Sequence, residues 1–220
     1  MTARLPLFPL GTVLFPGLVL PLHLFEERYR LLMRDLLKTP EPRRFGVVAI
    51  ELGHEVGAGA ARRLAAVGCT AELRTVRPHA DGRFDVVTVG TARFRLKEVD
   101  RSGPYPVGEV EHLGEEVGAG AEAAAAGAAR LFRVYRERLL SVGAEVEEPS
   151  EPPVDPVRLS YLIAAAAVLD PGEEQLLLEA EDAASRLRLE QDLLEREIRL
   201  LEVLPSVPAG RFLSGAVHPN

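Results

Sequence analysis

The sequence of 220 residues contains one cysteine, Cys69, no tryptophan, and only two lysines, Lys38 and Lys97. One cysteine cannot form an intramolecular disulfide, which favours a reducing compartment such as the cytoplasm. Basic residues are also scarce relative to acidic ones, 26 against 33, and the formal net charge is −7. An acidic chain is not typical of proteins with a broad nucleic-acid-binding surface.

Motifs for catalysis and cofactor binding are missing as well. Neither lysine follows a glycine, so the sequence has no phosphate-binding loop of the Walker type. The glycine fingerprint of dinucleotide-binding folds and the G-x-S-x-G nucleophile motif are absent. The five histidines are scattered singly, without metal-ligand spacing, and Cys69 is expected to be a small buried residue. The sequence therefore predicts no catalytic residue, no cofactor and no metal site.

A stretch without charged residues runs from Leu5 to Phe25 and reads LPLFPLGTVLFPGLVLPLHLF. Its length suits a membrane span or a signal peptide. Prolines at positions 6, 9, 16 and 21 interrupt it, and the longest piece without proline has six residues. Because proline removes a backbone donor and clashes with the preceding helical turn, a continuous apolar helix is not favoured. The stretch is instead predicted to form short buried strands joined by Pro/Gly turns.

The first half of the chain has the pattern of strands and turns with one helix among them. The helix is predicted from Glu26 to Leu37, where apolar residues recur at spacings of three and four. A hairpin is predicted around the Asp81–Gly82 turn, and the strictly alternating RFRLKEV follows it. Several short strands at even spacing favour a small barrel or a strongly curled sheet.

After Gly120 the chain becomes helical, beginning with the alanine-rich segment AEAAAAGAARLFRVYRERLL. Aspartate–proline pairs at 155–156 and 170–171 are typical helix starts, with aspartate as N-cap and proline in the first turn. Glu173 completes a capping box at the second start. The pattern predicts one long helix from 171 to about 204, at the end of a helical bundle.

The opening LPLFPLGTVLFPGLVLPLHLFEERYRLLMRD strongly resembles the N-terminal, substrate-binding domain of ATP-dependent Lon proteases, as found in stand-alone bacterial proteins. The resemblance continues through VGCTAEL, DGRFDVVTVGTARFRL, PYPVGEVEHL and LSYLIAAAAVLDPGEEQLLLE, and covers residues 1 to about 204. It implies an α+β fold in which a PUA-like β-barrel with one inserted helix precedes a helical bundle ending in a long helix. The expected parts are a barrel at 1–115, a bundle at 116–204 and a flexible tail at 205–220.

The function that this resemblance implies is a non-catalytic module that recognises unfolded or damaged polypeptide in the cytoplasm, as an adaptor or a holdase. Full Lon proteases add an ATPase module and a Ser-Lys peptidase, and neither is expected here. A protease or a chaperone is a further partner to test, whereas a membrane is not expected. Phe15, Leu18 and Phe45 are the candidates for peptide contact, on condition that they are exposed beside a groove between barrel and helices.

RNA binding is the alternative function, because PUA-like domains include RNA binders. It would require a basic cleft and an affinity that falls steeply with salt. The acidic total charge weighs against it. The arginines available for such a cleft are Arg62, Arg63, Arg74, Arg77, Arg93 and Arg95.

Overall fold

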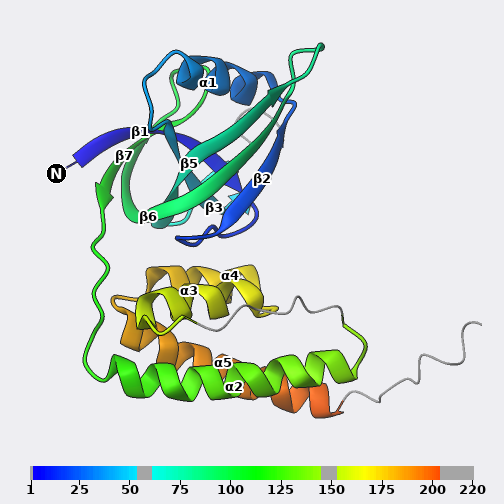
Figure 1. Cartoon of the computed structure of the whole chain (residues 1–220). Helices are drawn as coiled ribbons and strands as arrows, with labels where there is room; N and C mark the ends of the chain where they lie inside the picture. The colour runs from blue at the N-terminus through cyan, green and yellow to red at the C-terminus, as the bar shows by residue number, and fades with distance from the viewer. Residues whose placement is uncertain (1, 54–60, 145–152, 204–220) are drawn as a thin grey trace, which may run out of the picture.

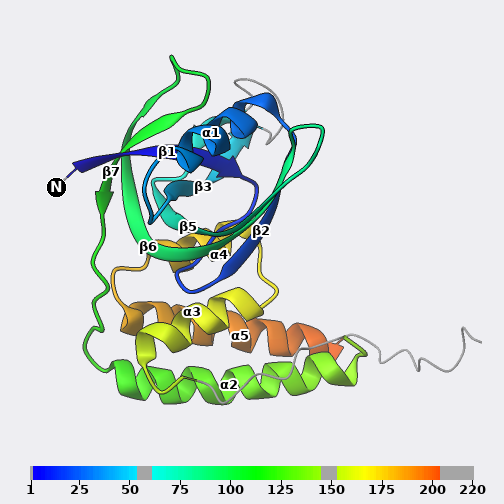
Figure 2. The same ribbon diagram turned by 45° about the horizontal axis from the view of Figure 1, so that its top comes forward.

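The computed structural model describes residues 2–53, 61–144 and 153–203, which form one half built of strands and one half built of helices (Figure 1). The elements in chain order are β1 (Thr2–Leu10), β2 (Val19–Leu24), α1 (Glu27–Leu37), β3 (Arg44–Gly53), β4 (Ala61–Leu64), β5 (Val67–Pro78), β6 (Phe84–Asp100), β7 (Val107–His112), α2 (Ala121–Ser141), α3 (Pro156–Ala166), α4 (Pro171–Glu179) and α5 (Ala183–Val203). In Figures 1 and 2, α3 and α4 lie next to the strands, and α2 and α5 form a layer beyond them. No helix in the described ranges has the length and apolar character needed to cross a membrane.

Within the described residues, seven strands form one sheet, in which every pairing is antiparallel except that of β1 with β3. β1 pairs with β7 through residues 2–6 and with β3 through residues 7–10. The strands β1, β7, β6, β5 and β3 therefore form a closed ring of hydrogen-bonded neighbours, while β4 extends from β3 and β2 pairs with β6. Closing the ring removes the free edges that an open sheet would expose.

Of the four prolines in the opening stretch, Pro6, Pro9 and Pro21 lie in these strands, whereas Pro16 lies in the turn before β2. The prediction of a turn is confirmed at Pro16–Gly17 and is wrong at Pro9, which continues β1. Pro6 is the last residue of β1 that pairs with β7, and Pro9 pairs with β3. Each of these prolines therefore has a paired strand on one side only. Pro21 lies in β2, whose described pairing is with β6. A proline is tolerated where one side of a strand has no ladder to join. Gly17, in the turn before β2, has a φ of 86°, a conformation that favours glycine.

α1 lies on the side of the strand half that faces away from the helices (Figure 1). It buries Tyr29, Leu32, Met33 and Leu36 in the core of the strand half. The ring of Phe8 stacks on the ring of Tyr29 with centroids 3.9 Å apart. Since burial of each large apolar side chain contributes roughly 1.5–3 kcal/mol, this face fixes the helix that the apolar spacing predicts.

Both aspartate–proline helix starts are present. The Asp155 carboxylate accepts a hydrogen bond from the backbone N–H of Val157 at 3.0 Å, at the start of α3. At the start of α4, the Glu173 carboxylate accepts from the backbone N–H of Asp170 at 3.3 Å. These side chains satisfy donors that the first turn of a helix leaves free.

The prediction of one long helix from 171 to about 204 is wrong, because the structure has two helices, α4 and α5, separated at residues 180–182. Asp182 begins α5, since its carboxylate accepts from the backbone N–H of Ser185 at 2.7 Å. The carbonyls that end α4 accept hydrogen bonds from two arginine side chains instead of from a further helical turn.

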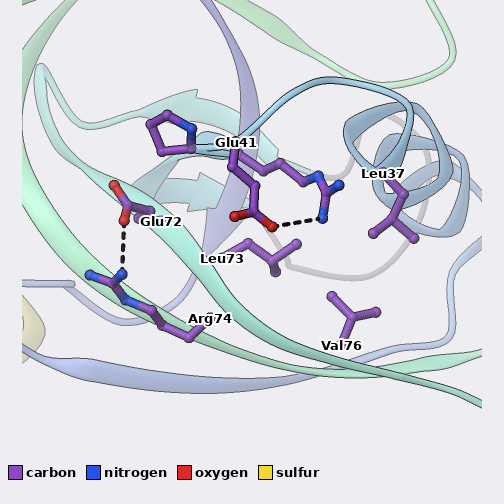
Figure 3. Close-up of a pocket in the computed structure, with 8 residues that line it drawn as sticks. Leu37, Glu41, Glu72, Leu73, Arg74 and Val76 are labelled. Carbon is purple, nitrogen blue, oxygen red and sulfur yellow. Dashed lines mark ion pairs between the residues drawn. The ribbon is translucent and has the colours of Figure 1, made fainter.

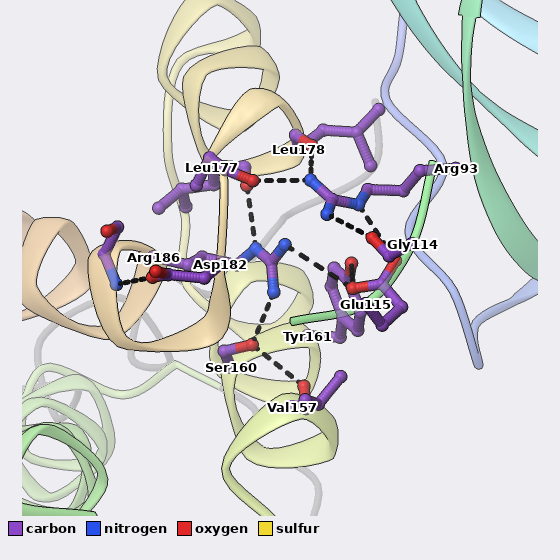
Figure 4. Close-up of polar contacts among 12 residues, drawn as sticks. Arg93, Gly114, Glu115, Val157, Ser160, Tyr161, Leu177, Leu178, Asp182 and Arg186 are labelled. Atoms are coloured by element: carbon purple, nitrogen blue, oxygen red, sulfur yellow. Dashed lines mark hydrogen bonds and ion pairs between the residues drawn. The ribbon is translucent and has the colours of Figure 1, made fainter. Parts of the chain in front are cut away.

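The first of these arginines, Arg93 of β6, reaches from the strand half to the helical half (Figure 4). It is 2 % exposed and donates to the carbonyls of Leu178 and Ala180 at 2.8 and 2.6 Å. Its Nε also donates to the Glu115 carboxylate at 2.9 Å. A side chain of β6 therefore provides the hydrogen bonds for the carbonyl groups at the end of α4. This contact sets the position of the helical half relative to the strand half.

The second arginine, Arg186 of α5, is fully buried. It donates to the carbonyl of Leu177 at 2.8 Å and to the hydroxyl of Ser160 at 2.9 Å, and its guanidinium lies 4.0 Å from the centre of the Tyr161 ring. The Tyr161 hydroxyl in turn donates to Glu115 at 2.7 Å. We refer to Arg93, Glu115, Tyr161 and Arg186 as the junction.

The domain limits predicted from the sequence stay a prediction. The strands end at His112 and the helices of the second half begin at Ala121, so the expected boundary at residue 115 falls in the connector between them. The expected tail, 205–220, lies outside the described residues.

Candidate functional site

A hollow of about 530 Å³ lies at the C-terminal end of α1, where the helix meets β5 (Figure 3). We call it the α1 hollow. It is lined by Leu37, Glu41, Pro42, Arg43, Glu72, Leu73, Arg74 and Val76.

The apolar part of the α1 hollow comes from α1 and from an irregularity in β5. Leu37 is the last residue of α1 and is 36 % exposed. Leu73 and Val76 are three residues apart in β5, yet both pack against the core of the strand half. The pairing register of β5 with β6 shifts between Leu73 and Thr75, and such a bulge changes the face to which the following side chains point.

The charged part of the α1 hollow consists of arginine–glutamate pairs. Arg43 lies 3.5 Å from Glu41, and Arg74 lies 2.9 Å from Glu72 (Figure 3). Glu72 also pairs with Arg44 at 2.8 Å. We call these two pairs, Arg43–Glu41 and Arg74–Glu72, the rim of the α1 hollow. Each arginine of the rim has an acidic partner, so the positive and negative charges of the rim are equal in number.

Three of the six arginines considered for RNA binding are buried or paired with a carboxylate. Arg93 is buried in the junction, and Arg74 is paired with Glu72. Arg63 of β4 is paired with Glu51 at 2.6 Å. Nothing in the structure favours the RNA-binding alternative over a site for polypeptide.

A smaller hollow of about 190 Å³ lies at the other end of α1, beside β2, and we call it the β2 hollow. Phe25, which is 52 % exposed, lies at this hollow between β2 and α1. The residues that line it are Phe8, Pro9, Leu10, Pro21, Leu22, His23, Leu24, Phe25, Glu26 and Tyr29. Most of them belong to the opening stretch of the sequence, which therefore supplies both core and surface.

Next to the β2 hollow, the structure brings together His23, His79 and Asp85, which we call the histidine cluster. Nδ1 of His23 lies 2.6 Å from one Asp85 carboxylate oxygen, and Nε2 of His79 lies 2.7 Å from the other. Hydrogen bonds from these two imidazoles hold the pKa of the Asp85 carboxyl below its usual value. The sequence gives no sign of this cluster, because His23 meets Asp85 only through the pairing of β2 with β6.

None of the three residues predicted for peptide contact lines either hollow. Phe45 is 1 % exposed and packs in the core of the strand half. Phe15 is equally buried, close to the Tyr161 ring at the place where the sequence predicts a groove between barrel and helices. Leu18 is half-buried and packs against the apolar cluster that contains Phe15 and Tyr161. Contact of these residues with a polypeptide stays a prediction, and the structure shows them supporting the fold.

The thiol of Cys69 is fully buried in β5. Burial raises the pKa of this thiol to about 12, so the thiolate that a nucleophile needs is disfavoured. This environment agrees with the interpretation of Cys69 as a small buried residue.

Comparison with protein families gives a match to the model of the ATP-dependent protease La (LON) substrate-binding domain over residues 4–196. Among curated proteins, Lon protease 2 of Myxococcus xanthus is 29 % identical over 203 residues, which are 90 % of this chain and 24 % of that protein. Lon protease of Anaeromyxobacter dehalogenans is also 29 % identical, over 91 % of this chain and 24 % of its own length. The chain thus spans about a quarter of these relatives.

Two solved structures share the fold. The Lon N-terminal domain protein from Xanthomonas campestris is 26 % identical, with a TM-score of 0.60, and the match covers 92 % of this chain and 99 % of that one. The N-terminal domain of a Mycobacterium avium complex Lon protease is 20 % identical with a TM-score of 0.65, over 88 % of this chain and 98 % of that one.

Proposed function

Since the chain belongs to the family of the LON substrate-binding domain, we propose that it binds segments of unfolded or damaged polypeptide and catalyses no reaction itself. The family description supports a substrate-binding role. The low thiolate character of Cys69 agrees with a non-catalytic role. The relatives that carry the name Lon protease are about four times as long as this chain, and their activity is not assigned to it.

The α1 hollow is the observation that carries the proposal. Its volume of about 530 Å³ lies in the range of roughly 300–1,000 Å³ that is typical of ligand-binding pockets. An unfolded polypeptide offers apolar side chains together with unpaired main-chain N–H and C=O groups. Leu37, Leu73 and Val76 provide an apolar surface for the side chains of the polypeptide. The arginine–glutamate pairs of the rim provide hydrogen-bond donors and acceptors for its main-chain groups.

Balanced charge suits a binder of many sequences. A strongly basic or acidic rim would select segments of one charge, whereas paired arginines and glutamates repel neither sign strongly. Apolar surface in the client then becomes the main determinant of binding, which is the property that distinguishes an unfolded chain from a folded one.

In this proposal the protein acts as a holdase or as an adaptor that passes its client to a protease or chaperone. We assign the closed ring of strands to the PUA-like barrel class implied by the sequence, with α1 as the inserted helix. The cytoplasm is the expected location, since the single cysteine is a free thiol.

Binding of a permanently unfolded, fluorescently labelled client tests the proposal when affinity is measured by anisotropy without ATP. Replacing Leu37 with glutamate places a charge on the floor of the α1 hollow, and we expect affinity to fall about tenfold, equivalent to roughly 1.4 kcal/mol. Leu140→Glu is the matched control, because Leu140 is also exposed and helical but lies in α2. It is expected to leave affinity within about twofold.

Two results would contradict the proposal. The first is an absence of binding to several unfolded clients in assays where an established holdase binds them. The second is an equal loss of affinity in Leu37→Glu and Leu140→Glu, which would place binding away from the α1 hollow. Circular dichroism of both variants separates a binding defect from unfolding.

A further inference from the structure

The histidine cluster brings three metal-ligating side chains from separate segments to one point. His23 comes from β2, Asp85 from β6, and His79 from the turn between β5 and β6. One ligand atom from each, two imidazole nitrogens and a carboxylate oxygen, lie within 4.8 Å of one another. The backbone fixes this arrangement, because His23 is the direct partner of Asp85 in the β2–β6 pairing and the N–H of His79 donates to the Arg83 carbonyl at 2.8 Å.

We propose that the histidine cluster binds a divalent transition-metal ion of the zinc class. Neutral imidazole nitrogen and carboxylate oxygen are common protein ligands of Zn²⁺, at distances of about 2.0–2.2 Å. Three protein ligands leave a fourth tetrahedral position for water. The side chains are between one third and one half exposed, so that water can reach this position.

Small side-chain movements convert the hydrogen-bonded arrangement into a metal site. Ligand atoms around a tetrahedral zinc ion lie about 3.4 Å apart. The imidazole nitrogens contact different oxygens of Asp85, at 2.6 and 2.7 Å. The contact to the oxygen that binds the metal ion must therefore open by about 0.7–0.8 Å, and the proton of that hydrogen bond is released to solvent. Partly exposed side chains can make this adjustment by rotation, without a shift of the strands that carry them.

The charges that face the cluster permit a cation. Asp85 supplies a carboxylate group, and so a negative charge, at the metal position. Arg83 lies 3.5 Å from the other ring nitrogen of His23, and it is paired with Asp81 at 2.7 Å. Arg77 is the partner of Asp85 on β5 and is exposed. Asp81 offsets the charge of Arg83, and the charge of the exposed Arg77 is screened by water, so that the negative charge of Asp85 still attracts a metal ion.

A bound metal ion would tie the end of β2 to the turn between β5 and β6. His23 also lines the β2 hollow. Its imidazole ring is stacked with the ring of Phe25, and the two ring centroids are 6.3 Å apart. The ion would therefore hold one wall of the β2 hollow in place. This inference rests on the cluster alone and does not depend on the proposed function.

Titration of the full chain with ZnCl₂ by isothermal calorimetry, after treatment with a chelator, tests the site. We expect about one equivalent of Zn²⁺ to bind at the cluster. Replacing His79 with alanine is expected to weaken this binding by more than about 100-fold, since loss even of an outer-shell partner of a metal ligand costs about 10- to 100-fold. Co²⁺ as a spectroscopic probe should give visible absorption bands in the wild type that are lost in His79→Ala.

His112→Ala is the matched control, because His112 is exposed on β7 and is not part of the cluster. It is expected to bind Zn²⁺ like the wild type. The proposal is overturned if no Zn²⁺ binds, or if His23→Ala and His79→Ala bind it as tightly as the control. All three substitutions remove partly or fully exposed side chains, and thermal unfolding without metal checks that each variant is folded.

Discussion

The junction and the α1 hollow are built from the same kinds of side chain, arginine and glutamate against apolar groups, but they differ in burial. At the junction, Arg93 and Arg186 are almost completely removed from water, and their guanidinium groups bind the backbone carbonyls that end α4 (Figure 4). At the α1 hollow, Arg43 and Arg74 lie at the surface in ion pairs with Glu41 and Glu72.

This difference in burial assigns the two regions different roles. A buried charge without its partners carries a large desolvation penalty, so the junction has only one favourable arrangement. An exposed ion pair is weak and exchanges readily with water or with a ligand. The junction is therefore expected to set the geometry of the two halves, and the α1 hollow is free to adapt to what it binds.

Replacing Arg186 with methionine should have the largest effect on stability. The substitution keeps an unbranched side chain but removes the hydrogen bonds to the Leu177 carbonyl and the Ser160 hydroxyl, and the cation over the Tyr161 ring. We expect the free energy of unfolding to fall by about 3–5 kcal/mol, as measured by urea denaturation. A loss below about 1 kcal/mol would show that the buried contacts of Arg186 do not stabilise the packing of α3, α4 and α5.

Glu190, one helical turn after Arg186, should make stability depend on pH. It is 2 % exposed, and neither carboxylate oxygen has a hydrogen-bond partner among the described residues. Burial raises its pKa well above the usual value, although the charge of Arg186 acts in the opposite direction. The folded protein then keeps Glu190 protonated while the unfolded chain ionises above about pH 4.3.

For this reason Glu190 should make the folded state less stable as pH rises, by about 1.4 kcal/mol per pH unit between the unfolded and folded pKa values. Glu190→Gln removes the ionisation, and its stability should equal that of the wild type near pH 4 and exceed it at neutral pH. Denaturation curves at several pH values measure the difference. A constant difference across this range would contradict a raised pKa for Glu190.

Removing one tyrosine hydroxyl from the junction and one from the surface of α1 compares a buried hydrogen bond with a more exposed one. Tyr161 donates to Glu115 at 2.7 Å within the junction, and Tyr105 donates to Asp35 of α1 at 3.1 Å in a more exposed setting. We expect Tyr161→Phe to lower the free energy of unfolding by about 1–2 kcal/mol, and Tyr105→Phe by about 0.5 kcal/mol or less. Equal losses in the two variants would argue that burial does not determine the strength of these hydrogen bonds.

Features set by neighbouring residues could be predicted from the sequence. The prolines at positions 6, 9 and 21 argue against a helix by removing backbone donors, and they are found in strands with a free side. The spacing of apolar residues predicts α1, and aspartate followed by proline predicts the starts of α3 and α4. Each of these signals acts within a few residues, so a single sequence contains it in full.

Features that depend on distant residues could not be predicted. The break between α4 and α5 is satisfied in part by Arg93, which is 85 positions before Leu178, and no local pattern reveals that contact. His23 and Asp85 are 62 positions apart and meet only after β2 pairs with β6. In the same way, Phe15 is apolar enough for a binding groove but is covered by α3 through Tyr161. The candidate site therefore had to be located from the structure.

The smallest effect on stability is expected from Arg74→Met, which makes at the α1 hollow the same substitution proposed for the junction. Arg74 is half exposed and lies 2.9 Å from Glu72, which keeps Arg44 as a second partner at 2.8 Å. Because an exposed ion pair contributes about 0–1 kcal/mol, the free energy of unfolding should change by about 0.5 kcal/mol or less, and less still in high salt. Urea denaturation at low and high salt measures this change. A loss close to that of Arg186→Met would mean that the rim belongs to the rigid scaffold, and it would remove the physical basis for an adaptable polypeptide site at the end of α1.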